Sequence, residues 1–160
     1  MVPDQHVVHT IDPAYIVSKD RLLDYFEFRE HRGPLTDATA SVSHRHPACG
    51  DVVDLAVCVE AGLLQTLRFE ARGCMVSQAA AAMLCEALEG QPVDRLTTFT
   101  AHDMLALVGL PLSPRRIACA LLPLEAARLL AAKLPRTTPA TAPPATAEPP
   151  PSAPADTPST

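Results

Sequence analysis

The period of the hydrophobic pattern changes at Cys74, and this change limits the chain to folds that combine a sheet with packed helices. Before Cys74, two apolar segments at 51–59 and 63–70 flank a short connection at 60–62 that contains a glycine. Apolar and polar residues alternate at 67–70, and alternation beside a glycine-bearing connection is typical of a β-hairpin. We therefore expect a hairpin immediately before Cys74.

A further strand and several helices complete the expected layout. A strand-like stretch lies at about 38–45, so we expect an antiparallel sheet of about three strands with helices on one face. After Cys74, residues 77–90 are rich in strong helix formers and end at a glycine. Other helices are expected at about 19–30, with Ser18 as its cap, at about 100–108, and at 116–133, where Pro123 fits only in the first turn or at a kink. This arrangement predicts an α+β domain.

The last part of the chain has a different composition. From Pro135 to Thr160 the residues are almost entirely Pro, Ala, Thr and Ser. Such a segment has no large apolar side chains to bury, so ordering it would cost conformational entropy without compensation. We expect a folded domain at 1–134 and a disordered tail at 135–160.

Charge and hydropathy exclude several classes of protein. The net charge of −5 and the sequence pI of about 5.6 argue against a nucleic-acid partner. No apolar stretch approaches the roughly 20 residues that span a bilayer, and the first residues lack a basic and apolar leader. We expect a protein that stays in the cytoplasm, away from membranes.

The five cysteines are the residues that point to chemistry. In a compartment that keeps thiols reduced, metal binding or thiol chemistry is a better use for them than disulfides. Each of Cys49, Cys74 and Cys119 is expected at the end of a structural element, and Asp51 can supply a fourth, harder ligand. Taken singly, each of these three cysteines is better explained as a small buried apolar residue than as a ligand, and we expect Cys58 and Cys85 to be core residues of this kind.

Three ordered motifs carry a family resemblance that runs from about residue 20 to 133. Residues 47–51, Pro-Ala-Cys-Gly-Asp, resemble the N-P-x-C-G-D motif of the IscU/NifU/SufU family of iron–sulfur cluster scaffold proteins, with His46 where Asn is usual. Residues 72–83 resemble that family's G-C-x-x-S-x-A-S-x-S-x-M segment, and residues 114–121 its third-cysteine segment. The resemblance implies an IscU/SufE-like fold.

The resemblance also implies a function and a ligand set. It implies that Cys49, Asp51, Cys74 and Cys119 hold a transient 2Fe-2S cluster or Zn²⁺, with Cys119 as the candidate sulfur acceptor. Asp51 matches the family aspartate that keeps the cluster labile. The implied partners are a cysteine desulfurase and apo iron–sulfur proteins, and the implied role is that of a scaffold, monomeric or weakly dimeric, rather than a turnover enzyme.

Two departures leave the subfamily open. Ala118 replaces the His that many IscU members carry before the third cysteine, and residues 112–116 differ from the segment that a dedicated chaperone reads. Both changes resemble SufU, yet the interval from Cys74 to Cys119 has no room for the SufU insertion. The alternatives are a zinc-dependent, SufU-like sulfurtransferase and a structural zinc module. His44 and His46 are secondary candidates for ligation, and Arg115 and Arg116 for docking an acidic desulfurase surface.

Overall fold

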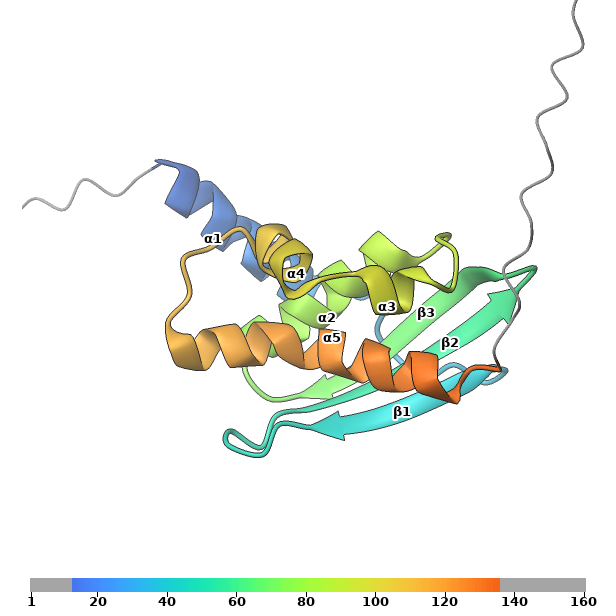
Figure 1. Ribbon diagram of the computed structural model, residues 1–160. Helices are drawn as coiled ribbons and strands as arrows, with labels where there is room; N and C mark the ends of the chain where they lie inside the picture. The colour runs from blue at the N-terminus through green and yellow to red at the C-terminus, as the bar shows by residue number, and fades with distance from the viewer. Residues whose placement is uncertain (1–12, 136–160) are drawn as a thin grey trace, which may run out of the picture.

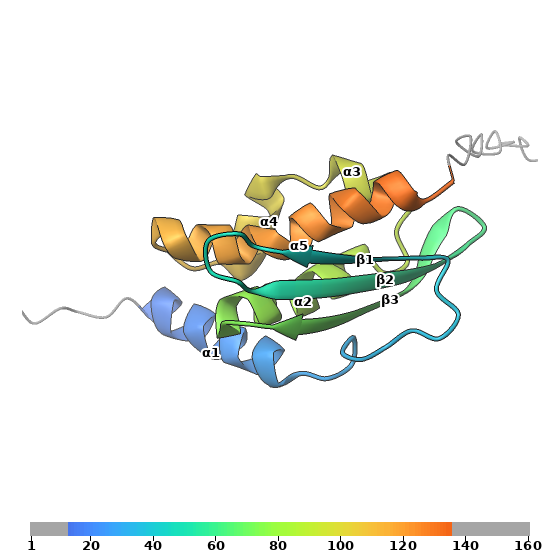
Figure 2. The same ribbon diagram turned by 90° about the horizontal axis from the view of Figure 1, so that it is seen from below.

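A three-stranded antiparallel sheet in the order β1-β2-β3 forms one layer, and all the helices lie on one side of it (Figure 1 and Figure 2). The computed structural model describes residues 13–135. Helices α2 and α5 pack directly on the sheet, and α1, α3 and α4 pack on those two helices. The elements are α1 (Pro13–Glu27), β1 (Ala40–Arg45), β2 (Val52–Glu60), β3 (Leu63–Arg72), α2 (Met75–Leu88), α3 (Arg95–Thr98), α4 (Ala101–Val108) and α5 (Pro114–Lys133).

The expected hairpin is confirmed in its position and its turn. β2 and β3 are joined by Ala61 and Gly62, whose φ angles are 50° and 77°. Two-residue turns with a positive φ at both positions are favoured in hairpins because their twist matches that of the flanking strands. Since the side-chain period of a strand is two, this turn also decides which residues face the helices.

The sheet has one covered face, as the sequence predicts. On β2, Val53, Leu55 and Val57 are at most 1% exposed and lie under the helices. Ala79–Ala82 of α2 are likewise at most 1% exposed. Their short side chains allow the helix backbone to approach the sheet closely, so a core with few aromatic residues can still be densely packed.

The first helix was predicted with the wrong boundaries. α1 begins at Pro13, so Ser18 lies inside the helix and is not its cap. Proline suits a first helical turn because its φ angle is already helical and its missing N–H would have no partner there. The helix ends at Glu27 because the chain then runs along the edge of β3, where Phe69 N–H donates to the carbonyl of His31 and Gly33 N–H donates to that of Phe69.

The later helices are confirmed, with one correction. α4 begins with a capping box between Thr100 and Asp103 and ends at Gly109, whose φ is 66°. Pro123 lies in the interior of α5, so the alternative that placed it in the first turn is wrong. Because proline has no N–H, the carbonyl of Cys119 receives no hydrogen bond from position 123. The short α3 was not predicted, since four residues are too few to show a helical period.

The remaining expectations concern membranes and the ends of the chain. Within residues 13–135, no helix is both long and apolar enough to cross a bilayer. Apart from Pro135, the tail predicted at 135–160 lies outside the described residues.

Candidate metal centre

One end of the sheet collects the residues that the sequence marks as ligands. β1 ends at Arg45 opposite Val52, and Val52 lies opposite Arg72 at the end of β3. The first turns of α2 and α5 lie at this same end (Figure 1). All four predicted ligand residues are located there: Cys49 and Asp51 in the β1–β2 loop, Cys74 just before α2, and Cys119 near the start of α5.

The loop that carries Cys49 and Asp51 is closed by its own hydrogen bonds. His46 N–H donates to the carbonyl of Asp51 at 2.8 Å, and Gly50 N–H donates to the carbonyl of His46 at 2.9 Å. Gly50 has a φ of 75°, a left-handed conformation that glycine adopts at little cost. The ring Nδ1 of His46 accepts from the N–H groups of Ala48 and Cys49, each at 3.3 Å. His46 is therefore a structural acceptor within the loop.

Cys74 is the N-cap residue of α2. Its backbone is extended, with φ −71° and ψ 160°, and its Sγ accepts from the N–H of Ser77 at 3.4 Å. A cap residue usually supplies oxygen for this purpose, and here sulfur takes its place.

Three of the four predicted ligand residues are already gathered. Each of Cys49, Asp51 and Cys119 contributes one ligand atom, and these three atoms lie within 4.8 Å of one another. Cys119 is buried, with 3% of its surface exposed. Cys74 lies beside this group: its side chain interacts with both Asp51 and Cys119, and its backbone N–H donates to Asp51 Oδ2 at 3.2 Å. The fourth predicted ligand residue is therefore adjacent to the other three.

Asp51 is a buried carboxylate that the fold keeps ionised. Its surface is 7% exposed, and burial acts to raise its pKa. Hydrogen bonds from Cys74, Ser77 and Cys49 outweigh the burial, so the pKa of Asp51 lies below its ordinary value. An ionised carboxylate is the form that binds a cation.

The thiol of Cys119 has the opposite tendency. Burial, followed by interactions with Cys74, Cys49 and Asp51, raises the pKa of Cys119 to about 12. Without a cation, several thiols and a carboxylate this close together cannot all be charged. A bound metal reverses this balance, since a coordinating thiol loses its proton outright. Three sulfur donors and one oxygen donor suit a tetrahedral zinc ion or the iron of an iron–sulfur cluster.

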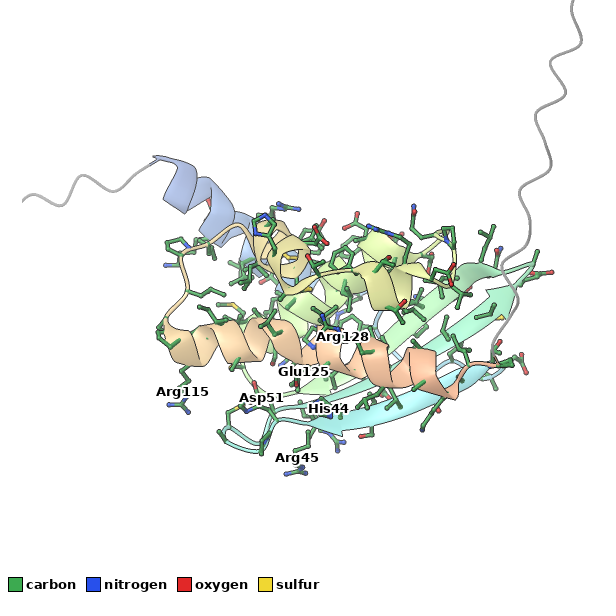
Figure 3. All side chains as sticks on the ribbon, viewed as in Figure 1. His44, Arg45, Asp51, Arg115, Glu125 and Arg128 are labelled. Carbon is green, nitrogen blue, oxygen red and sulfur yellow. The ribbon has the colours of Figure 1, made fainter. Side chains whose placement is uncertain are left out.

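The other candidate residues have ordinary roles in this structure. His44 Nε2 lies 3.0 Å from Glu125 Oε2 of α5, which occupies that nitrogen. Figure 3 shows Asp51 beneath the N-terminal half of α5, with the Arg45 and Arg115 side chains directed outward. Cys85 is buried in the core, as predicted, whereas Cys58 is only partly buried on β2.

Two residues that the sequence analysis left without a role shape this site. Ser77, 1% exposed, places its hydroxyl 3.0 Å from Asp51 Oδ2. Gly73 has a φ of 150°, and a Cβ on it would lie 2.3 Å from Asp51 Cγ. The glycine before Cys74 and the serine three residues after it are visible in the sequence. Their contact with Asp51, which is distant along the chain, is not.

Comparison with known proteins places these features in a family. Residues 17–138 match the model of the NifU-like N terminal domain. The chain is 35% identical over 77 residues to a protein of Thermotoga maritima named iron–sulfur cluster assembly scaffold protein IscU, a match covering 48% of this chain and 54% of that protein. The chain thus spans about half the length of this relative.

Two further comparisons cover more of the matched proteins. The chain is 26% identical over 118 residues to the zinc-dependent sulfurtransferase SufU of Bacillus subtilis, covering 63% of this chain and 80% of that protein. The crystal structure of a putative iron–sulfur cluster assembly scaffold protein for the SUF system, from Fervidobacterium islandicum, superposes with a TM-score of 0.60 at 21% identity. That superposition covers 70% of this chain and 94% of the other, and at this identity it shows a common fold.

Proposed function

This chain belongs to the family of NifU-like N-terminal domains, and from that membership we propose that it is a scaffold on which iron–sulfur clusters are assembled. The observation that carries the proposal is the convergence of Cys49, Asp51 and Cys119, with Cys74 alongside, at one end of the sheet. The cluster is the cargo of this site.

The ligand set suits temporary binding. Thiolates are soft ligands that hold iron and zinc firmly, whereas a carboxylate is a harder ligand that binds iron less tightly. A site that mixes both can retain a cluster and still hand it to a recipient. The ligands come from a loop and two helix starts. Cys49 and Cys74 are partly exposed, so a donor or a recipient can approach the site from their side, whereas Asp51 and Cys119 are buried.

The chemistry begins with sulfur from a cysteine desulfurase. A site thiolate attacks the terminal sulfur of the desulfurase persulfide, a new S–S bond forms, and the desulfurase thiolate leaves. Cys119 is the proposed acceptor from the family pattern, and its high pKa means that its proton must be lost first. Iron and reducing electrons from separate donors then convert bound sulfur to sulfide in a 2Fe-2S cluster, and apo iron–sulfur proteins receive it.

A zinc-dependent sulfurtransferase is the second candidate, and one observation favours it. Donor atoms within 4.8 Å of one another need only small side-chain rotations to surround a tetrahedral zinc with bonds of about 2.0–2.3 Å. In this reading the zinc is resident, and Cys49, Asp51, Cys74 and Cys119 are its ligands. An arriving persulfide would then displace one of them.

The test compares metal and sulfide contents. Protein purified without oxygen is incubated with a cysteine desulfurase, cysteine and ferrous iron, and iron, zinc and acid-labile sulfide are measured with the visible spectrum. The variants are Asp51→Ala and, as a matched surface control, Asp54→Ala. A sulfide-containing chromophore that forms in wild type and persists longer in Asp51→Ala supports the scaffold.

The other outcomes are equally informative. Tightly held zinc, no chromophore and faster desulfurase turnover would support the sulfurtransferase instead. Zinc without either activity would contradict both proposals and leave a structural zinc module. Cys58→Ala and Cys85→Ala should bind metal as wild type does, because neither thiol belongs to the gathered group.

A further inference from the structure

Two hydrogen-bond donors from the start of α2 meet at one oxygen of the Asp51 carboxylate. Cys74 N–H donates to Oδ2 at 3.2 Å, and the Ser77 hydroxyl donates to the same atom at 3.0 Å. Both donors belong to the start of α2, and Ser77 is 1% exposed, so water does not compete for its hydroxyl. A hydrogen bond to an ionised acceptor in such a place is stronger than one between neutral groups.

This arrangement gives the two oxygens of Asp51 different tasks. Oδ2 accepts both of these hydrogen bonds from α2, and we take Oδ1 to be the oxygen that binds a metal. Oδ1 lies on the side of Gly73, where the missing Cβ leaves space, since a Cβ there would lie 2.6 Å from it. The orientation of the carboxylate is therefore set before any metal arrives.

We propose that Ser77 is a positioning residue that holds Asp51 with Oδ1 toward the metal and so slows the loss of metal from the site. The inference rests on the proposed function in one respect, because it takes Asp51 to be a metal ligand. Hydrogen-bonding partners behind metal ligands commonly change metal affinity by about 10- to 100-fold when they are removed.

Ser77 also has contacts that would matter without any metal. Its N–H donates to Sγ of Cys74, the N-cap residue of α2, and its hydroxyl lies 2.9 Å from the Cys74 carbonyl oxygen. A serine with only this structural role would affect the unfolding free energy of the domain but not the metal through Asp51. The experiment must separate these two effects.

A double-mutant cycle on zinc release makes the separation. Wild type, Ser77→Ala, Asp51→Ala and the double variant are loaded with Zn²⁺, and release to an excess of a chromophoric chelator is timed. We expect Ser77→Ala to release zinc about tenfold faster than wild type. In the Asp51→Ala background, the same serine substitution should change the rate by less than about twofold, because its partner is gone.

Cobalt supplies a second readout that a structural role would not move. In Co²⁺-loaded Ser77→Ala, the d–d absorption should change while the thiolate-to-cobalt charge-transfer bands remain, since only the oxygen ligand is disturbed. Ser77→Thr keeps the hydroxyl and should restore the wild-type release rate and spectrum. Ser43→Ala, a substitution at an exposed serine of β1, is the matched control.

Three results would overturn the inference. The first is release of zinc from Ser77→Ala at the wild-type rate. The second is an equal increase in the release rate when the serine is replaced in the wild-type and in the Asp51→Ala backgrounds. The third is a d–d band of Co²⁺-loaded Ser77→Ala that does not differ from that of wild type. A wild-type chain that binds neither Zn²⁺ nor Co²⁺ would overturn it together with the proposed function. If the chain binds zinc through Asp51 but neither forms a cluster nor stimulates a desulfurase, only the proposed function is contradicted. The double-mutant cycle then still decides the role of Ser77.

Discussion

Replacing Gly73 with alanine tests the central packing contact of the site. The new Cβ would lie 2.3 Å from Asp51 Cγ and 2.7 Å from Asp51 Cβ, far inside van der Waals contact. The backbone cannot absorb the clash, because φ at this position is 150° and alanine is strained there already. The Asp51 side chain must therefore leave its position, and its hydrogen bonds from α2 must break or lengthen.

The magnitude follows from two contributions. A non-glycine residue held in a sparsely populated region of backbone conformation costs on the order of 1–3 kcal/mol. Losing one hydrogen bond to the buried carboxylate adds about 1.5–3 kcal/mol. We expect Gly73→Ala to lower the unfolding free energy of the metal-free protein by roughly 2.5–6 kcal/mol. The affinity for Zn²⁺ should fall by at least about tenfold, because Asp51 is no longer aimed at the metal.

Gly90→Ala is the matched control. Gly90 also has a positive φ, 80°, but nothing lies within 4 Å of the position of its Cβ. This variant should show backbone strain alone, about 1–2 kcal/mol, with unchanged zinc affinity. Urea unfolding in the presence of a chelator gives the stabilities, and competition with a chromophoric chelator gives the affinities. Equal losses in the two variants, or wild-type zinc affinity in Gly73→Ala, would refute the account of the Asp51 contact.

Four further predictions concern the loop, the thiols and the metal. His46→Asn should keep the wild-type affinity for zinc, since an amide oxygen can also accept from the loop N–H groups. In His46→Ala the zinc affinity should fall about fivefold, which is equivalent to about 1 kcal/mol for one hydrogen bond. The same chelator competition measures both affinities. In metal-free protein at pH 8, alkylation followed by peptide mass spectrometry should find Cys119 unmodified while Cys58 reacts. The rise in the pKa of Cys119 to about 12 from the usual 9 lowers its thiolate fraction about a thousandfold, and comparable labelling of the two would contradict this. Because burial raises the pKa of both Cys119 and Cys85, their contribution to stability is complete below the pKa of an unfolded cysteine and should be lost as the pH rises from about 9 toward 12. Finally, chelation should leave the helical circular dichroism intact because the core between the sheet and the helices is built from apolar side chains, and collapse of the signal would favour a structural zinc module.

The elements with clear local signals could be predicted well. The hairpin around Gly62 and the helices after Cys74 follow from alternation, turn residues and helix formers, which act over a few neighbouring residues. The end of α1 could not be found this way. Residues 28–33 leave the helix to cover the edge of β3, and an edge strand that needs partners is a property of the assembled sheet.

The candidate site, like the fold, has features that the local sequence predicts and features that it does not. The sequence by itself determined the residue types, three cysteines and an aspartate at the ends of elements, because ligand chemistry and the motifs around it are local. Only the tertiary structure decided that Cys49, Asp51 and Cys119 meet, and that Gly73 and Ser77 lie against the carboxylate of Asp51. Such contacts join residues far apart in the chain. Their geometry depends on how helix α2 packs against the sheet, which no local pattern contains.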